Sequence, residues 1–506
     1  MVRLSALVSA LILAAWASAQ SFTLTILHTN DMHAHVEQTR VSGMMLGGYA
    51  RQATLIKRLR ASDPNVVLLN GGDTFQGTIF FNTYEGLADL AFMNAVKFDA
   101  MAVGNHEFDK GPGLLGEFAR AAAFPVLAAN LDVSAEPALN GVIKPSAVLT
   151  VGGQRVGVVG AVTEELPTIS FMGDNVKMLG LVSSCQAAID ALRSQGIDKI
   201  VMVTHVGYRE EIALARSLSG VDVIVGGHSH TLLGSTGVEG LPTGPDYPTV
   251  VKNKDGDTAL VVQAWHWGLV LGRIQVTFDS MGRVTGHTGA PVAVTEDIAE
   301  DPVVASMVRA FNRPIAAMKD KVIGATLREI PRGDSNIAAQ LIADAQLEAT
   351  QHLGSVAAFI NAGGVRAAID AGDITYGEAL MVQPFGNTLV VIELKGSELA
   401  AALSRGGGGT LLPSRGTSYE LVGGTARNIV VAGAPLDPSR TYKVTVNNFT
   451  AGGGDNHVEI KAATGARVES GIVDVDALIE YIKKRSPLDL VPENRVKTGT
   501  HFRLAG

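Results

Sequence analysis

From residue 22 to residue 263, short and strongly apolar runs alternate with segments of helical periodicity, and this alternation constrains the fold more than any other feature of the chain. Short runs of apolar and β-branched residues predict strands, whereas apolar residues at every third or fourth position predict helices. Because the strand-like runs are mostly apolar at successive positions, we expect both faces of those strands to be buried. The order of elements predicts an α/β sandwich. The expected strands are Phe22–His28, Val66–Asn70, Ala100–Val103, Ile200–Thr204, Val221–Val225 and Ala259–Gln263, and the clearest helices are Gly48–Arg60 and Leu87–Val96.

The rest of the chain predicts a linker and a second domain, because 506 residues are too many for one comfortable hydrophobic core. Asp279–Asp297 has no clear periodicity, and we interpret it as a loose linker at a domain boundary. Asp301–Lys321 has the apolar stripe of one long helix, which Pro314 would kink. Beyond it, a helix over Asn336–Thr350 precedes several β-rich runs, which is typical of an α+β domain. These runs are Ala357–Ile360, Leu389–Leu394, Arg427–Val431 and Tyr442–Asn447.

The N-terminus has the pattern of a secretory signal. Arg3 precedes the apolar run Leu4–Trp16, and Ala17-Ser18-Ala19 matches a small-x-small cleavage site, so that a mature chain would start at Gln20. An uncleaved membrane anchor is the alternative, and the shortness of the apolar run disfavours it. We therefore expect a secreted or periplasmic protein that has no membrane association after cleavage. The predicted boundaries are a signal peptide at 1–19, a first domain at 20–297, a linker helix at 298–323 and a second domain at 324–506.

Charge and cysteine content narrow the class of partner. The net charge of −8 does not suggest the basic face that proteins use to wrap nucleic-acid polymers, so we expect a small-molecule substrate instead. We also expect a monomer. Cys185 is the one cysteine, which excludes a disulfide within the chain. Its neighbours predict a buried thiol on a helix.

Side chains that can bind metal ions follow five of the expected strands. Because loops at the carboxyl ends of strands in an α/β sheet converge on one crevice, we expect these side chains to lie close together. Imidazole and carboxylate ligands suit Zn, Mn, Fe or Co better than Ca or Mg, and two cations at one site need a shared carboxylate, for which Asp73 is the natural candidate. Each motif alone is common in turns, and only the ordered set is specific. The set is Asp31 and His33, then Asp73, then Asn105, His106, Glu107 and Asp109, then His205, and finally His228 and His230.

The segments Thr29–His33, Gly71–Asp73, Gly104–Glu107, Thr204-His205 and Gly226–His230 resemble those of calcineurin-like metallophosphoesterases. More narrowly, the chain resembles the secreted 5′-nucleotidases and the related UDP-sugar hydrolases and 2′,3′-cyclic-nucleotide phosphodiesterases. The resemblance implies a four-layer α/β metallophosphoesterase sandwich followed by a smaller α+β substrate-binding domain. It implies that Asp31, His33, Asp73 and His230 surround one divalent cation (Zn, Mn or Co) and that Asp73, Asn105, His205 and His228 hold another. Some relatives have Gln or Asn where this chain has His230, which leaves the contact of this residue with a metal open.

The same resemblance implies roles for residues that do not bind metal. His106 would reach the phosphoryl or leaving oxygen, and Asp109 would orient its ring, although Asp109 could instead cap a helix starting near Gly113. In the second half, Asn361–Arg366, Pro384–Asn387 and Asn448–Asp455 resemble the nucleotide-binding segments. There, Phe385 and Phe449 would sandwich the base, Asp455 would take a ribose hydroxyl, and Asn361 would belong to the same substrate site. Arg366 and Arg332 are candidates for the phosphate, with Arg332 alternatively an ordinary surface charge.

These features together predict a two-metal hydrolase that removes phosphate from nucleotides, with water attacking phosphorus in line and a hinge near Asp301–Lys321. A 5′-nucleotidase that releases nucleoside and phosphate is the favoured form. The alternatives are a 2′,3′-cyclic-nucleotide 2′-phosphodiesterase, a UDP-sugar or NAD pyrophosphohydrolase, a thiosulfohydrolase on the same scaffold, and a non-catalytic nucleotide-binding protein. For His28, and for the cluster Trp265-His266-Trp267, packing in the core is the favoured interpretation, with lining of the metal cleft as the alternative for the cluster.

Overall fold

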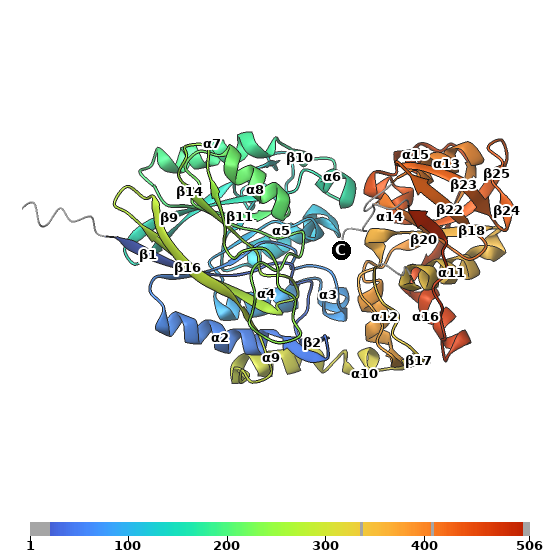
Figure 1. Ribbon diagram of the computed structural model, residues 1–506, viewed down its shortest axis with the longest axis horizontal. Helices are drawn as coiled ribbons and strands as arrows, with labels where there is room; N and C mark the ends of the chain where they lie inside the picture. Colours follow the sequence, from blue (N-terminus) through green and yellow to red (C-terminus); the bar gives the residue numbers. More distant parts are fainter. Residues whose placement is uncertain (1–20, 334–336, 406–408, 499–506) are drawn as a thin grey trace, which may run out of the picture. The chain divides into compact units, whose positions relative to one another are not determined.

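The structure is a computed structural model that describes residues 21–333, 337–405 and 409–498 (Figure 1). The predicted signal peptide and the first residue of the helix predicted over Asn336–Thr350 lie outside the described residues. Within the part of the chain that is described, no helix combines the length and the apolar character needed to cross a membrane. The described residues divide into two compact units, the first made of those up to residue 74, 87–166 and 171–308, and the second of 75–86, 167–170 and those from residue 309 onward.

The first unit is built on two six-stranded sheets. In the first sheet, β1, β4, β5 and β6 are parallel neighbours, and β15 and β16 extend it as an antiparallel hairpin. In the second sheet, β9, β11, β12 and β14 are parallel, and each edge carries one antiparallel strand. The order in the first sheet is β16 (Val284–Ala293), β15 (Val270–Phe278), β1 (Phe22–Thr29), β4 (Val66–Asn70), β5 (Ala100–Ala102) and β6 (Val126–Leu127). The order in the second sheet is β13 (Thr249–Lys252), β14 (Thr258–Val262), β12 (Val223–Val225), β11 (Ile200–His205), β9 (Gln154–Val162) and β8 (Ser146–Val151).

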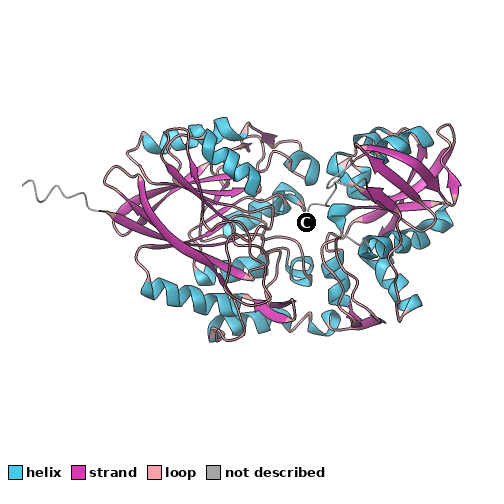
Figure 2. Ribbon diagram, viewed as in Figure 1, coloured by secondary structure: helices cyan, strands magenta, loops and turns pink. Residues whose placement is uncertain are grey.

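The two sheets pack face to face, and helices cover their outer sides. Side chains from both sheets, such as Leu69 and Val203, share one buried core. A second core joins the outer face of the second sheet to α7 (Leu181–Arg193) and α8 (Tyr208–Ser217). Figures 1 and 2 show these helices on one side of the paired sheets, with α2 (Tyr49–Ser62) and α4 (Leu87–Val96) on the other. The four-layer α/β sandwich is therefore confirmed, as is the buried position of Cys185 on a helix.

Shorter elements connect these layers. A small hairpin follows β1, a two-stranded ribbon lies between β6 and α7, and one turn of 3-10 helix begins at His106. They are β2 (Gln38–Val41) with β3 (Met44–Gly47), β7 (Leu131–Asp132) with β10 (Lys177–Met178), η1 (His106–Phe108) and α5 (Gly111–Ala121). The short helix α6 (Leu166–Ile169) begins at the last residue of the segment 87–166 of the first unit and continues into residues 167–170 of the second.

Two sequence-based interpretations near residue 300 are wrong. Asp279–Asp297 is not a loose linker, because Val284–Ala293 forms β16 and pairs with β15 along its length. An edge strand with one solvated face needs few apolar residues, which is why the sequence lacked a clear strand pattern. Asp301–Lys321 is not one long helix either: α9 (Pro302–Asn312) ends before Pro314, and a short α10 (Ala316–Lys319) follows. Proline disfavours helical backbone at the preceding residue and cannot donate a backbone hydrogen bond, so it breaks this helix rather than kinking it.

The second unit has the α+β organisation that the sequence predicts. Its main sheet is antiparallel except for the parallel pair β18 and β25, and α11 (Ile337–Thr350) is almost entirely buried. The main sheet has the order β21 (Leu411–Pro413), β18 (Ala357–Asn361), β25 (Thr441–Asn447), β20 (Thr388–Lys395) and β26 (Arg467–Val473). A smaller sheet has the order β24 (Ala434–Pro435), β23 (Thr425–Val431), β22 (Ser418–Val422) and β27 (Val496–Thr498). The other elements are α3 (Ile79–Tyr84), β17 (Val322–Thr326), η2 (Gln351–Leu353), η3 (Ala362–Gly364), β19 (Gly372–Thr375), α12 (Tyr376–Val382), α13 (Gly396–Leu403), α14 (Asn448–Ala451), η5 (Gly454–Asn456), α15 (Val458–Ala462) and α16 (Asp474–Arg485).

Candidate functional site

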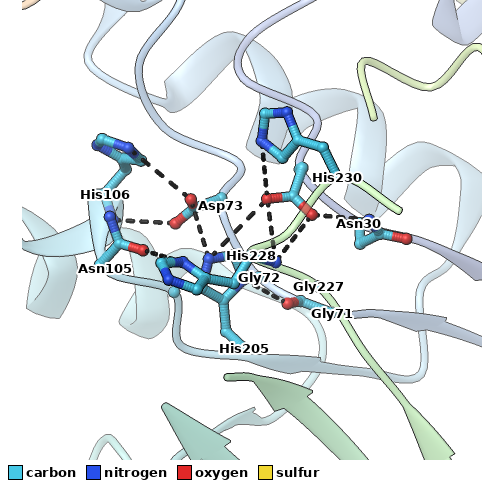
Figure 3. Close-up of polar contacts among 12 residues, drawn as sticks. Asn30, Gly71, Gly72, Asp73, Asn105, His106, His205, Gly227, His228 and His230 are labelled. Atoms are coloured by element: carbon cyan, nitrogen blue, oxygen red, sulfur yellow. Dashed lines mark hydrogen bonds and ion pairs between the residues drawn. The ribbon is translucent and has the colours of Figure 1, made fainter. Parts of the chain in front are cut away.

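The predicted metal-binding side chains of the first unit converge at the carboxyl ends of five parallel strands. Figure 3 shows Asp73, Asn105, His205, His228 and His230 grouped together, with His106 beside them. The strands that carry them belong to both sheets: β1, β4 and β5 to the first, and β11 and β12 to the second. The sequence predicted that these side chains meet at the edge of one sheet, whereas the structure brings them together from two sheets packed face to face.

One cluster of possible ligand atoms contains Asp31, His33 and His230. The Nε2 atoms of His33 and His230 are 3.1 Å apart, and Oδ1 of Asp31 lies 3.2 Å from Nε2 of His230 and 3.9 Å from Nε2 of His33. Ligand atoms that each lie about 2.0–2.2 Å from one cation are separated by similar distances. The residues therefore fit a single divalent cation, and His230 is positioned to contact it.

A second cluster contains Asp31, Asp73 and His205, so Asp31 belongs to both groups. Nε2 of His205 is 3.0 Å from Oδ2 of Asp73. The Nδ1 atom of His205 lies 2.7 Å from the carbonyl of Gly71, which places the ring proton on Nδ1. Nε2 is left buried without a hydrogen bond among the described residues. An imidazole whose Nδ1 is held by a backbone carbonyl and whose Nε2 points at two carboxylates fits a metal ligand that gives up its Nε2 proton when a cation binds.

Asn105 and His228 face each other next to this cluster. Oδ1 of Asn105 is 3.0 Å from Nδ1 of His228, and Nε2 of His228 lies 3.8 Å from the exposed Glu165. Their placement is compatible with the second cation of the sequence prediction. The assignment of particular residues to each of two cations, and of Asp73 as the shared carboxylate, stays a prediction.

The electrostatics of the centre favour bound positive charge. Burial favours the neutral form of Asp73, but the imidazoles of His205, His106 and His33 outweigh it and hold its pKa well below the usual range. For His205, burial opposes the charged form, yet Asp73 and Asp31 raise its pKa to about 10. Two buried carboxylates thus create a local negative potential that divalent cations would neutralise.

His106 and Asp109 form a close pair at the edge of this centre. Nδ1 of His106 is 2.6 Å from Oδ2 of Asp109, and Nε2 lies 3.9 Å from Oδ2 of Asp73. The backbone N–H of His106 also donates to Oδ1 of Asp73 at 2.9 Å. The helix α5 begins at Gly111, with Lys110 as its N-cap residue, so the capping role considered for Asp109 is not what the structure shows.

The loops of the centre hold several non-glycine residues in left-handed backbone conformations. Such conformations are strained and persist only where surrounding contacts enforce them, which is common at functional sites. They include Asp31 (φ 51°), His33 (47°), Asp73 (54°), His228 (76°), His230 (50°), Trp265 (60°) and Trp267 (55°).

Two residues support the loops of the centre: Glu107, which the sequence suggested only as a possible metal ligand, and Asn30, to which the sequence gave no role. The buried Glu107 accepts hydrogen bonds from the backbone N–H groups of Asp73, Thr74 and Gly104 at 3.0, 2.7 and 2.7 Å. Asn30 donates to Oδ2 of Asp31 at 2.7 Å and to the carbonyl of Trp265 at 2.6 Å. In both cases the sequence offered one indication of a supporting role, which is a polar residue close to a predicted metal ligand.

The aromatic cluster Trp265-His266-Trp267 and the nearby histidines pack against the loops of the centre or in the core. The backbone N–H of Trp267 donates to the carbonyl of Asp31 at 2.7 Å, and the ring of His35 stacks on Trp267. The His266 ring lies 4.9 Å from that of His230, so the cluster packs directly behind the metal-binding loops. His28 is a buried core histidine that contacts the hydroxyl of Tyr247 at 2.8 Å, and burial lowers its pKa to about 3.

In the second unit, the predicted ribose-binding residue belongs to a hydrogen-bonded chain of side chains. Nδ2 of Asn361 donates to Asp455 at 2.7 Å, and Nδ2 of Asn447 donates to Oδ1 of Asn361 at 3.0 Å. Asn361 and Asn447 end the parallel neighbours β18 and β25, which explains why segments distant in the sequence meet.

The predicted phosphate-binding and base-binding residues also lie in this unit. The guanidinium of Arg366 is 5.7 Å from the centre of the Phe385 ring, within cation–π range. Desolvation, and then the charge of Arg366, lower the pKa of Arg332 to about 10, although its side chain keeps access to solvent. Phe449 packs against Gly454, where an added Cβ would come within 2.5 Å of the ring. The sandwich of a base between Phe385 and Phe449 stays a prediction.

Comparison with known proteins covers nearly the whole chain. The family model described as calcineurin-like phosphoesterase matches residues 24–232, and the model described as 5′-nucleotidase, C-terminal domain, matches residues 314–463. A 5′-nucleotidase from Diplobatis ommata is 36% identical across 97% of this chain and 92% of its own length, and one from Homo sapiens is 33% identical across 96% and 93%.

Solved structures give the same picture. The crystal structure of a 5′-nucleotidase precursor from Thermus thermophilus is 41% identical, with a TM-score of 0.91, over 95% of this chain and all of that chain (100%). A sulfate thiohydrolase from the same species has a TM-score of 0.77 at 18% identity, over 96% of this chain and 98% of that one. At that identity the likeness shows a shared fold alone.

Proposed function

The chain belongs to the 5′-nucleotidase family of calcineurin-like phosphoesterases, and on that premise we propose that it hydrolyses nucleoside 5′-monophosphates to nucleoside and phosphate. One observation carries the proposal: buried carboxylates and imidazoles cluster beside the His106–Asp109 pair in a chain that matches 5′-nucleotidases over nearly its full length. The thiosulfohydrolase and the non-catalytic binding protein are not favoured, since the first rests on fold alone and the second has no need of the His106–Asp109 pair.

The residues of the centre fit divalent cations of the Zn, Mn or Co type. Asp31, His33, Asp73, Asn105, His205, His228 and His230 would hold them. When bound, such cations supply Lewis acidity and concentrated positive charge at the phosphoryl group. The left-handed loops and the buried carboxylates keep the donor atoms in place, so little reorganisation is needed when cations and substrate bind.

His106 acts on the substrate rather than on a cation in this proposal. Asp109 holds the proton on Nδ1, directs Nε2 away from that contact, and favours the imidazolium form. A cationic ring at this position donates a hydrogen bond to a phosphoryl oxygen or to the leaving oxygen, where negative charge builds during hydrolysis.

Residues of the second unit hold the nucleoside and its phosphate. The rings of Phe385 and Phe449 stack on a base, an interaction worth about 1–3 kcal/mol per base that tolerates different bases. Asp455, which already accepts a hydrogen bond from Asn361, binds a ribose hydroxyl. Arg366 and Arg332 bind phosphate oxygens through their planar guanidinium groups.

Export from the cytoplasm completes the proposal. Its support is the basic–apolar–small pattern of residues 3–19 and the similarity to a structure that is described as a precursor. N-terminal sequencing of the secreted protein would give Gln20 as the first residue, and retention of Met1 would contradict the signal peptide.

A phosphate-release panel tests the activity. The purified protein is assayed with AMP, UDP-glucose, 2′,3′-cyclic AMP and NAD, and its metal content is measured in parallel. Inorganic phosphate is measured for AMP, and the nucleotide products of the other three substrates are separated by chromatography, because their first hydrolysis yields phosphate monoesters rather than free phosphate. We expect phosphate release from AMP that is lost on chelation and restored by Mn²⁺ or Co²⁺, with a loss of about 10²–10⁴-fold in His106→Ala. Activity confined to the other three substrates, or unchanged activity in His106→Ala, would overturn the proposal.

A further inference from the structure

A buried pair of side chains, Glu211 and Gln263, lies behind the loop of residues 226–231, and no role described above uses it. Glu211 is on α8 and Gln263 directly follows β14, and both are fully buried. Nε2 of Gln263 donates to the Glu211 carboxyl group at 2.9 and 3.1 Å. Burying a polar group without a hydrogen-bond partner costs free energy of folding, so the other hydrogen bonds of Glu211 and Gln263 matter. Those bonds show which part of the chain the pair holds in place.

Gln263 bonds to both ends of the loop. Its Nε2 donates to the carbonyl of Gly227 at 2.8 Å, on the N-terminal side of His228. Its Oε1 accepts from the backbone N–H of Thr231 at 3.0 Å, on the C-terminal side of His230, and from Oγ of Ser229 at 3.2 Å. The two histidines are thus bracketed by hydrogen bonds to one amide group.

Glu211 holds the same loop from the helix side. Its Oε1 accepts from the backbone N–H of Gly227 at 3.1 Å and lies 3.4 Å from Oγ1 of Thr204, the residue before His205. A Cβ at position 226 would come within 2.1 Å of the Glu211 carboxyl group, so this close approach requires Gly226. The glycine doublet therefore leaves room for the carboxyl group behind the loop.

The loop has a reason to need this support. His228 and His230 are both in left-handed conformations, which non-glycine residues adopt only under constraint. His230 belongs to the cluster with Asp31 and His33, whereas His228 faces Asn105 at the other cluster. Any change in the loop therefore moves donor atoms at both clusters.

We propose that Glu211 and Gln263 are positioning residues that fix His228 and His230 together, so that one buried amide–carboxyl pair sets the geometry of both cation sites. This inference rests on the proposed two-cation centre. Residues that orient metal ligands from behind typically change metal affinity by about 10–100-fold when they are replaced.

The test measures cation binding rather than turnover. Co²⁺ affinity is determined by chelator competition, and the visible absorption of bound Co²⁺ reports its coordination geometry. The variants are Gln263→Leu, which removes every contact of the amide, and Glu211→Gln, which keeps the side-chain shape. The matched control is Gln186→Leu. The Gln186 amide on α7 also bonds one backbone N–H and one backbone carbonyl, both of Ser219, away from the centre.

We expect Gln263→Leu to weaken Co²⁺ binding about 10–100-fold at both sites and to change the absorption spectrum, with a smaller effect in Glu211→Gln. Gln186→Leu should bind Co²⁺ like the parent, even if its apo-protein melts earlier. Two bound Co²⁺ ions in the parent, with variant affinities and spectra equal to those of Gln186→Leu, would overturn this inference alone. A parent that binds no Co²⁺ would overturn the proposed function with it. If Gln263→Leu does not fold, Glu211→Gln decides the outcome in the same way.

Discussion

Substitution of Gly104 by alanine should inactivate the metal centre although it replaces none of the proposed metal-binding side chains. Gly104 follows β5 and precedes Asn105, and its backbone is not in the left-handed region. An added Cβ would lie 2.2 Å from Oδ1 of Asp73, 2.4 Å from its backbone nitrogen and 2.7 Å from Oε2 of Glu107. Since real Cβ atoms rarely approach other atoms within 3.4 Å, Asp73 must move by about 1 Å.

The size of that movement sets the expected loss. Bonds from carboxylate oxygens to a divalent cation are about 2.0–2.2 Å long and cannot absorb a displacement of that size. A misplacement of about 1 Å at a reacting centre typically lowers the rate about 10²-fold. Gly104→Ala should therefore lose about 10²-fold or more in phosphate release from AMP and should retain less metal after dialysis.

Gly113 provides the matched control for this experiment. It lies in α5, also outside the left-handed region, and a Cβ there would meet nothing within 4 Å. Gly113→Ala should keep full activity and gain up to about 1 kcal/mol from its higher helix propensity. Initial rates, metal analysis and thermal melting of both variants complete the assay. Parent-like activity and metal content in Gly104→Ala would refute the argument that Asp73 needs this space.

Three further predictions concern other parts of the molecule. Asp109→Asn should lower kcat about 10²-fold with little change in KM, since it removes the anion that supports the His106 imidazolium; an unchanged kcat in steady-state assays would contradict this. Phe449→Ala should raise KM for AMP about tenfold while the rate with p-nitrophenyl phosphate, which has no base, stays the same; equal effects on both substrates would contradict base stacking. Burial raises the pKa of Asp474 from 3.8 to about 7. Between pH 4 and pH 7 the carboxyl group is ionised in the unfolded chain but protonated in the folded protein, so the free energy of unfolding falls as the pH rises through this range. In urea titrations, Asp474→Asn should therefore be more stable than the parent by on the order of a few kcal/mol at pH 8 but not at pH 4. A difference in the free energy of unfolding that is the same at both pH values would contradict the raised pKa.

Local sequence determined the elements and the positions of the chemistry along the chain. The strand Val66–Asn70 and the helix Leu87–Val96 were predicted with the bounds that the structure shows, because each has a clear apolar period ended by polar residues or glycine. The same local reasoning placed Asp31, Asp73 and His205 at strand ends. These features depend on residues within a few positions of one another, so a single sequence contains them.

The tertiary structure decided which of these strand ends meet and which buried residues support their loops. The sequence could not show that His205, His228 and His230 come from a different sheet than Asp31 and Asp73, because sheet packing depends on apolar contacts between residues far apart in the chain. Val284–Ala293 became a strand only through pairing with β15, and Gln263 acquired its role only through contact with Glu211 and the loop 226–231. Such contacts leave no periodic pattern, since hydrogen bonds and burial across long separations are chosen by the fold as a whole rather than by neighbouring residues.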